Sequence, residues 1–360
     1  MTKEKCYIIA EAGVNHNGSL EMAKELVIKG KEAGADAVKF QTFKAEAVSS
    51  KFAIKAEYQI KNTGNEEETQ LNMIRKFELT FGQHEELAKF SKSNGVTYLS
   101  SPFDIASVDF LKALGLPLLK IPSGEITNAP LLYQAAKTGL PLILSTGMAN
   151  LDEIRMGLAV ISYALNNEND PEGIRDFNEI IKRKSDFEDL KGKVSLLHCT
   201  TEYPCPKNAV NLLAMKTLFN EFGLTVGYSD HTEGIIVPAL AVSSGAKIIE
   251  KHFTLDKNLP GPDHKASLDP KELKEMVSLI RETEIFMGKE EKVPGVEESK
   301  NIPIVRKSLV ASKEIKKGEI FSNENVTTKR PGTGISAMKY WDFIGLEAGK
   351  DYSEDELIEG

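Results

Sequence analysis

The chain has 360 residues and a net charge of −8, with 41% hydrophobic and 27% charged residues. A chain of this length is usually longer than one hydrophobic core can serve, which favours one large domain and one small one. The negative charge, without any block of Lys and Arg, argues against nucleic-acid binding. No apolar run approaches the ~18–20 residues that cross a bilayer. Three cysteines and the lack of a signal-peptide core predict a cytoplasmic protein with reduced thiols.

Short apolar runs alternate with longer amphipathic stretches along most of the chain. We expect strands at residues 7–10, 37–41, 97–100, 118–121, 142–145, 194–198, 225–227 and 247–251. We expect helices near residues 19–34, 82–94, 105–114, 128–138, 150–166, 209–222, 233–244 and 270–287. Eight alternations of this α/β kind favour a closed (β/α)₈ TIM barrel over an open sheet. The long segment 42–81 is expected to be a functional loop, and 167–193 a solvated insertion.

The pattern changes near residue 286, which predicts a barrel domain at 1–286 and a second domain beyond it. Residues 287–305 carry glycines and prolines among charges, without a clear period, and are predicted to form a linker. The small domain would span 306–360, with strands at 308–311 and 319–321 joined by a turn. A unit of this size is marginally stable alone, so we expect it to pack on a barrel, its own or a partner's.

Polar side chains gather where the predicted strands end. Barrel enzymes place their active sites at the carboxyl ends of the strands, so this pattern predicts an active site there. The polar residues at or just after these ends are Glu11, Lys39, Gln41, Ser101, Lys120, Ser123, Glu125, Ser145, Thr201, Tyr203, Ser229, His231, Glu250 and His252.

The residue types suggest three kinds of chemistry. Two lysines with several serine hydroxyls suit a phosphate or carboxylate ligand; the alternative is that the lysines only pair with buried glutamates. His231 and His252 close neighbouring strands and together suit one divalent ion with open positions, Mn²⁺ rather than a closed zinc site. Glu11 and Glu125 are candidates for proton transfer, or for salt bridges alone.

Seven ordered motifs give the chain a resemblance to the sialic acid synthase family, the nonulosonate synthases. They are IAEAGVNHNG at 9–18, VKFQT at 38–42, KIPSGE at 120–125, LSTGM at 144–148, GYSDH at 227–231, EKHFT at 250–254 and GPDH at 261–264. The tail 306–360, with KRPGTG at 329–334, resembles the antifreeze-like (SAF, β-clip) domain of that family. The resemblance therefore spans the barrel and the tail.

The resemblance implies an enzyme that condenses phosphoenolpyruvate with an open-chain N-acetylated amino sugar and water, releasing phosphate by C–O cleavage. It assigns phosphoenolpyruvate to Lys39, Ser101, Lys120, Ser123, Ser145 and Ser229. It assigns the sugar to Gln41, Tyr203 and Asp263, proton transfer to Glu11, and a divalent metal to His231 and His252. That metal would be Mn²⁺, with Mg²⁺ or Co²⁺ as alternatives. Thr201 stands where several relatives have Asn, so a phosphate contact there is left open.

The resemblance further implies a domain-swapped homodimer in which Arg330 reaches the partner's site. Residues 122–128 and 261–267 resemble those of N,N′-diacetyllegionaminic acid synthases. This likeness implies 2,4-diacetamido-2,4,6-trideoxymannose as the sugar, which would give N,N′-diacetyllegionaminate. The alternative is N-acetylmannosamine, giving N-acetylneuraminate, because residues 56–60 resemble those of some N-acetylneuraminate synthases. More remote alternatives are a Schiff-base aldolase using Lys39 or Lys120, and a carbohydrate-binding protein led by its C-terminal domain.

Overall fold

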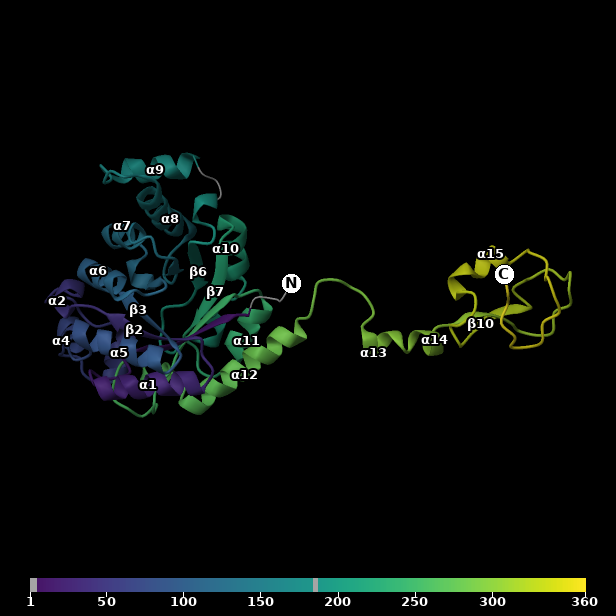
Figure 1. Cartoon of the computed structure of the whole chain (residues 1–360), viewed down its shortest axis with the longest axis horizontal. Coiled ribbons are helices and arrows are strands. Elements are labelled where there is room, and N and C mark those ends of the chain that lie inside the picture. Colours follow the sequence, from purple (N-terminus) through teal and green to yellow (C-terminus); the bar gives the residue numbers. More distant parts are fainter. Residues whose placement is uncertain (1–4, 184–186) are drawn as a thin grey trace. The chain divides into compact units, whose positions relative to one another are not determined.

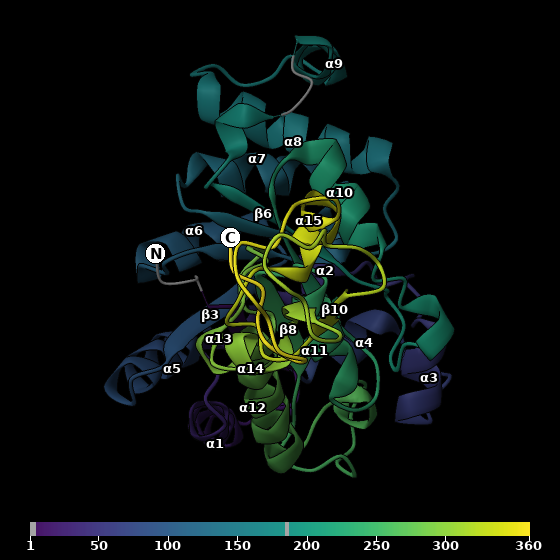
Figure 2. The same ribbon diagram turned by 90° about the vertical axis from the view of Figure 1, so that its right-hand side faces the viewer.

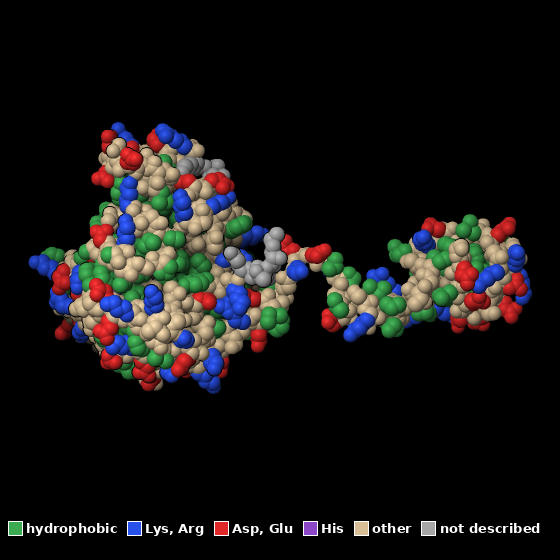
Figure 3. Space-filling model, in the orientation of Figure 1, with side chains coloured by type: hydrophobic (Ala, Val, Ile, Leu, Met, Phe, Trp, Pro, Cys, Tyr) green, Lys and Arg blue, Asp and Glu red, His purple; other side chains and the backbone are tan. Residues whose placement is uncertain are grey.

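The structure is a computed structural model that describes residues 5–183 and 187–360. The chain divides into two compact units, Met1–Gly288 and Lys289–Gly360, which are described separately. Among the described residues, no helix has the length and apolar character needed to cross a membrane. On the face shown in Figure 3, acidic and basic side chains are intermixed on both units, without a broad patch of one sign.

The first unit is built on eight parallel strands that form a barrel. The strands are β1 (Tyr7–Gly13), β2 (Ala37–Thr42), β3 (Thr97–Pro102), β4 (Leu119–Ile121), β5 (Leu142–Ser145), β6 (Val194–His198), β7 (Thr225–Asp230) and β8 (Ile248–His252). Their hydrogen-bonded order is β3-β2-β1-β8-β7-β6-β5-β4. Strands β3 and β4, at the two ends of this order, also lie side by side. The predicted TIM barrel is thereby confirmed.

Helices follow the strands and cover the outside of the barrel (Figures 1 and 2). They are α1 (Leu20–Glu32), α5 (Phe81–Ser93), α6 (Ile105–Leu114), α7 (Ala129–Lys137), α8 (Leu151–Asn166), α10 (Ala214–Phe222), α11 (Ile236–Ser243) and α12 (Pro270–Phe286). Several begin at a side chain that accepts a hydrogen bond from the first turn, as Asp104 does from the Ser107 N–H at 2.7 Å. The main core fills the space between the helices and the outer faces of the strands.

Inside the barrel, an apolar layer lies beneath a polar one. The apolar layer consists of Ile9, Ala37, Leu99, Ile143, Leu197 and Ile248, with Tyr7 and Leu118 packed against it. Because side chains alternate along a strand, the residue two positions later points to the same side. That residue is Glu11 after Ile9, Lys39 after Ala37 and Glu250 after Ile248. Apolar side chains therefore fill the interior of the barrel toward the amino ends of the strands. Polar side chains lie in the interior at the carboxyl ends.

The segment between β2 and α5, predicted as a loop, contains three short helices. These are α2 (Ala45–Val48), α3 (Glu57–Thr63) and α4 (Gln70–Arg75). The predicted insertion 167–193 contains α9 (Ile174–Arg183), of whose residues Phe177 is buried. Part of that insertion, 184–186, lies outside the described residues.

The second unit has its own small core around a two-stranded sheet. Strand β9 (Ser308–Ala311) pairs antiparallel with β10 (Val326–Lys329). The predicted strand at 319–321 is wrong, because the Phe321 N–H donates to the Leu346 carbonyl and Ile320 forms one isolated bridge with Glu347. The predicted linker holds two helices of one turn, α13 (Val296–Ser299) and α14 (Ile302–Val305), neither with a buried side chain. One more short helix, α15 (Tyr340–Phe343), completes the unit.

Candidate active site

A cavity of about 280 Å³ opens at the carboxyl end of the barrel. Thirteen of the fifteen residues predicted from the sequence line it. They are Glu11, Lys39, Gln41, Ser101, Lys120, Ser123, Ser145, Thr201, Tyr203, Ser229, His231, His252 and Asp263. Glu250, noted in the sequence as a strand-end carboxylate, also lines this cavity.

Two lysines and two glutamates form a buried charge cluster at the bottom of the cavity. Lys39 Nζ lies 2.6 Å from Glu11 Oε2 and 3.5 Å from Glu250 Oε2. Lys120 Nζ lies 3.1 Å from Glu250 Oε1, which also accepts a hydrogen bond from Ser229 Oγ at 2.8 Å. The lysines are thus paired with glutamates, as the salt-bridge alternative predicted, and they line the cavity as well.

The environment moves the pKa values of the two glutamates in opposite directions. Burial and the nearby Glu250 charge raise the pKa of Glu11 above its usual range, although Lys39 opposes this shift. Burial acts in the same sense on Glu250, but Lys120 and Lys39 outweigh it and hold the Glu250 pKa below its usual range. Glu250 is therefore a fixed negative charge that orders the lysines. Glu11 is the member of this cluster suited to exchange a proton.

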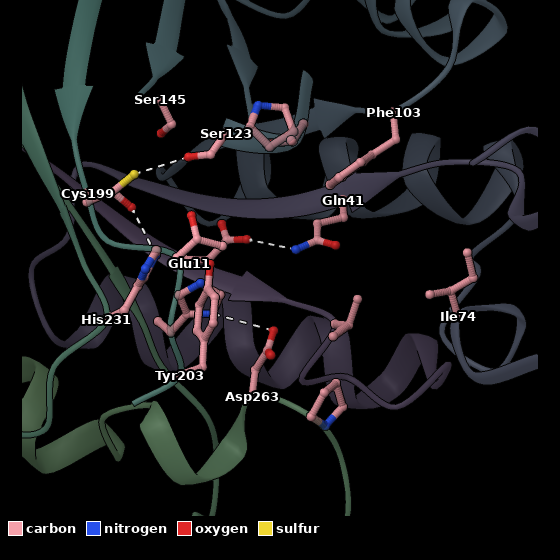
Figure 4. Close-up of a pocket in the computed structure, with 18 of the residues that line it drawn as sticks. Glu11, Gln41, Ile74, Phe103, Ser123, Ser145, Cys199, Tyr203, His231 and Asp263 are labelled. Atoms are coloured by element: carbon pink, nitrogen blue, oxygen red, sulfur yellow. Dashed lines mark hydrogen bonds and ion pairs between the residues drawn. The ribbon is translucent and has the colours of Figure 1, made fainter. Parts of the chain in front are cut away.

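Hydrogen-bond donors line the side of the cavity near β5 and β6. Among the described residues, the buried hydroxyls of Ser145 and Thr201 have no hydrogen-bond partner. Ser123 Oγ accepts a hydrogen bond from the Gly147 N–H at 3.1 Å and lies 3.1 Å from Cys199 Sγ. Buried hydroxyls without partners are costly unless a ligand satisfies them. Figure 4 shows Ser145, Ser123 and Cys199 on one side of the pocket.

Gly147 allows these hydroxyls to come together. A methyl group at this position would lie 2.4 Å from Thr201 Oγ1 and 2.8 Å from Ser123 Oγ. If these hydroxyls bind an anionic substrate, Gly147→Ala should displace both of them and raise the KM for that substrate by about tenfold or more, the effect of losing one or two good hydrogen bonds. Steady-state kinetics and a melting curve check this. An unchanged KM in a folded variant would contradict a binding role for this side of the cavity.

His231 and His252 lie together, with their ring centroids 5.5 Å apart. His231 Nδ1 lies 2.6 Å from the Thr200 carbonyl oxygen, which orients the ring, and His252 Nδ1 is buried without a hydrogen-bond partner among the described residues. Burial lowers the pKa of His231 to about 4 and that of His252 well below its usual value. Both imidazoles are therefore neutral near pH 7 and able to ligate a metal.

These two residues fit a divalent ion with open positions. Within the described part of the chain, no group of three or more His, Cys, Asp or Glu side chains is arranged to hold a metal. Two imidazoles can serve as protein ligands of a divalent ion when water or substrate completes the coordination. Asp263 Oδ2 lies 3.8 Å from His252 Nδ1, which is longer than a hydrogen bond.

Aromatic rings and a carboxylate line the upper part of the cavity. The Tyr203 ring lies 4.1 Å from the His231 ring and 5.0 Å from the Tyr58 ring, centroid to centroid. Asn62 Nδ2, from α3, donates to the Pro262 carbonyl oxygen at 2.7 Å and ties that helix to the site. Burial, followed by the Glu11 charge, raises the pKa of Asp263 to about 7. A carboxyl group with this pKa can accept or donate a hydrogen bond to a sugar hydroxyl.

Two predicted site residues lie elsewhere. Glu125 does not line the cavity; it belongs to a short 3₁₀ turn, η1 (Ser123–Glu125), and accepts a hydrogen bond from Asn128 Nδ2 at 2.6 Å. Its pKa is raised by burial. Arg330 belongs to the second unit, where its Nε donates to the Val305 carbonyl oxygen at 3.0 Å. Apolar residues of segment 42–81 also line the cavity, and the sequence pattern did not predict them.

The fold and the cavity define a TIM-barrel enzyme whose site places two lysines and several hydroxyls beside a pair of neutral imidazoles. The chain belongs to the NeuB family, whose sequence profile matches residues 26–292, and a SAF domain profile matches residues 306–360.

Named relatives match over almost the whole length. An N,N′-diacetyllegionaminic acid synthase of Campylobacter jejuni is 53% identical, covering 99% of each chain. One of Legionella pneumophila is 47% identical, covering 97% of this chain and 92% of its own. The solved N-acetylneuraminic acid synthetase of Leptospira borgpetersenii, in complex with citrate, is 32% identical with a TM-score of 0.68. That match covers 83% of this chain and 90% of the other.

Proposed function

We propose that this enzyme condenses phosphoenolpyruvate with 2,4-diacetamido-2,4,6-trideoxymannose and water to give N,N′-diacetyllegionaminate and phosphate. The full-length similarity to two N,N′-diacetyllegionaminic acid synthases, at 53% and 47% identity, carries the choice of sugar. The cavity supports the reaction, because its lysines and unpaired hydroxyls suit an anion and lie beside two neutral imidazoles.

In the proposed reaction, C3 of phosphoenolpyruvate forms a bond to C1 of the open-chain sugar, and the aldehyde oxygen takes up a proton. Water then adds to C2 and gives up a proton. The bond between C2 and the bridging phosphate oxygen then breaks, and the electron pair leaves with phosphate. The new C2 hydroxyl gives up its proton to the departing phosphate, so that a keto group remains at C2. Lys39, Lys120 and the hydroxyls of Ser145 and Thr201 would hold the phosphate and stabilise its departure.

Glu11 would move a proton in this reaction. Burial raises its pKa above the usual range of a carboxyl group, which makes Glu11 easier to protonate than Glu250, whose pKa is lowered. Gln41, whose Nε2 lies 3.4 Å from Glu11 Oε1, would orient the carboxylate and contact the sugar with Tyr203 and Asp263. Glu125 has less support, because it does not line the cavity.

His231 and His252 would hold a divalent metal, for which we propose Mn²⁺. When bound, such an ion would act as a Lewis acid toward a carbonyl oxygen. Tyr203, packed against the His231 ring, would limit the access of water to this side of the cavity.

We further propose a cytoplasmic homodimer in which Arg330 of one subunit completes the site of the other. Arg330 is exposed on the small second unit, as a group that meets another surface would be. Arg330→Ala should raise the KM for the sugar about 10- to 100-fold, the value of a lost charged hydrogen bond, and leave the KM for phosphoenolpyruvate unchanged.

Hybrid dimers test the exchange of this arginine directly. Mixing the Arg330→Ala protein with a His252→Ala protein should restore part of the activity, because one site in each hybrid would have both an intact barrel and an intact arginine. A verified heterodimer without restored activity would contradict the shared site.

A phosphate-release assay with two sugars tests the proposed function. Release from phosphoenolpyruvate should require 2,4-diacetamido-2,4,6-trideoxymannose and should be much slower with N-acetylmannosamine. The reverse preference would replace the proposed sugar with that of an N-acetylneuraminate synthase. A Schiff-base aldolase would instead give borohydride-trapped pyruvate on a lysine and full activity in EDTA.

A further inference from the structure

One side of the cavity is apolar and distinct from the rest. Its side chains form a hydrophobic cluster that is separate from the barrel core, and every member of the cluster lines the cavity. We call this cluster the apolar wall; it consists of Val14, Phe43, Met73, Ile74, Phe77 and Phe103. Hydrocarbon packed around a cavity selects the apolar part of a ligand.

The apolar wall and the polar groups come from different parts of the fold. Val14, Phe43 and Phe103 follow strands β1, β2 and β3, and α4 supplies Met73 and Ile74. The imidazoles and unpaired hydroxyls come from the ends of β5 to β8. Figure 4 shows Ile74 and Phe103 on the opposite side of Gln41 from Ser145, Ser123 and His231. A ligand that fills the cavity therefore meets donors and imidazoles at one end and hydrocarbon at the other.

The chain holds the apolar wall in place from outside the cavity. Glu78 accepts a hydrogen bond from the Ala45 N–H at 2.9 Å and pairs with Lys44 Nζ at 2.9 Å, which joins the two ends of the segment. Gly18, at φ +77°, lets the Lys76 backbone approach so closely that a Cβ there would lie 2.5 Å from the Lys76 oxygen. These contacts indicate a preformed surface.

Phosphoenolpyruvate does not explain the apolar wall, because it is small and carries several negative charges. The second substrate, the sugar, does explain an apolar surface in the cavity. In the proposed reaction its C1 aldehyde must meet C3 of phosphoenolpyruvate at the polar end. The far end of an open-chain hexose is C6, which in the proposed sugar carries no oxygen and is a methyl group.

We propose that the apolar wall binds the C6 methyl group of the sugar and selects 6-deoxy sugars over their 6-hydroxy counterparts. This inference rests on the proposed function, since it deepens the choice of sugar at the same site. A hydroxyl group placed against these side chains would lose its hydrogen bonds to water without gaining new ones. A methyl group makes no such hydrogen bonds and therefore carries no such cost. An apolar pocket of this kind discriminates by about tenfold to a hundredfold.

The test compares two sugars that differ only at C6. They are 2,4-diacetamido-2,4,6-trideoxymannose and 2,4-diacetamido-2,4-dideoxymannose. The unaltered enzyme should prefer the first by about tenfold to a hundredfold in kcat/KM. Ile74→Asn places a carboxamide beside C6 and should reduce this preference about tenfold, with an unchanged KM for phosphoenolpyruvate. Met73→Gln keeps the length of the side chain and provides a second variant in case the first is poorly folded.

A matched control is available on the same segment. Ile54 is 88% exposed and does not line the cavity, so Ile54→Asn should keep the preference of the unaltered enzyme. Equal use of both sugars by the unaltered enzyme, or an undiminished preference in folded Ile74→Asn and Met73→Gln, would overturn the role of the apolar wall. Turnover of N-acetylmannosamine alone would instead overturn the proposed function.

Discussion

Replacing His252 with alanine should lower turnover by on the order of 10³-fold or more and should remove tight Mn²⁺ binding. The imidazole is buried, neutral and within 5.5 Å of the His231 ring, centroid to centroid, and its Nδ1 has no hydrogen-bond partner among the described residues. Lewis-acid activation lowers the activation free energy of such reactions by several kcal/mol, which corresponds to the expected loss of turnover. Electron paramagnetic resonance titration measures Mn²⁺ binding independently of turnover.

The matched control for this change is His198→Ala. His198 ends β6, does not line the cavity and contacts the Val210 carbonyl oxygen at 2.9 Å through Nε2. Its loss should leave Mn²⁺ affinity unchanged. Undiminished Mn²⁺ affinity in folded His252→Ala would contradict the two-histidine site.

Lys39→Met should have the second large effect, on both binding and stability. Lys39 lies between Glu11 and Glu250, and its removal leaves the Glu11 carboxylate buried without its closest cation. Breaking a buried ion pair in this way costs about 3–5 kcal/mol. The loss of a charged contact should also weaken phosphoenolpyruvate binding by about 10- to 100-fold, measured by calorimetry.

The stability loss should depend on pH. Burial already raises the pKa of Glu11 in the folded protein, and without Lys39 that pKa rises further. A carboxyl group with a raised folded pKa destabilises the fold above its unfolded pKa, and the penalty fades as pH falls and the group protonates. In denaturant titrations, the stability deficit of Lys39→Met relative to the unaltered protein should therefore be larger at neutral pH than at acidic pH. It should shrink as the pH falls toward the pKa of an unfolded glutamate, about 4.3.

A second buried lysine separates the two effects. Lys55 pairs with Glu68 at 3.4 Å and does not line the cavity. Lys55→Met should lower stability but leave the affinity for phosphoenolpyruvate unchanged. If Lys39→Met and Lys55→Met had the same affinity as the unaltered protein, Lys39 would have a structural role alone.

The barrel and most of the cavity at its carboxyl end could be predicted from the sequence, because the alternation of side chains along a strand determines both. Side chains two positions apart share a face of a strand, so Lys39 with Gln41 and Glu250 with His252 were placed correctly on the inner face. That alternation ends where a strand ends. Glu125 follows Pro122 into a 3₁₀ turn and does not line the cavity, although a continued strand would have placed it with Ser123.

The alternation of side chains along a strand does not predict contacts between residues that are far apart in the sequence. The sequence left open which glutamate each lysine would pair with, since the answer depends on how neighbouring strands are aligned. Met73 and Ile74 reach the cavity because α4 folds back over the barrel, and helical periodicity in so short a segment gives no sign of this. In the second unit, β9 pairs with β10 because residues 319–321 bond to 345–348 instead.

The most direct test of the proposed reaction follows one oxygen atom. Phosphoenolpyruvate labelled with ¹⁸O at the bridging position is incubated with the enzyme, Mn²⁺ and 2,4-diacetamido-2,4,6-trideoxymannose, and the products are analysed by mass spectrometry. We predict phosphate release only when the sugar is present, with the label entirely in phosphate and a nine-carbon acid carrying unlabelled oxygen at C2. Label retained in the acid, or phosphate released without the sugar, would contradict the proposed condensation.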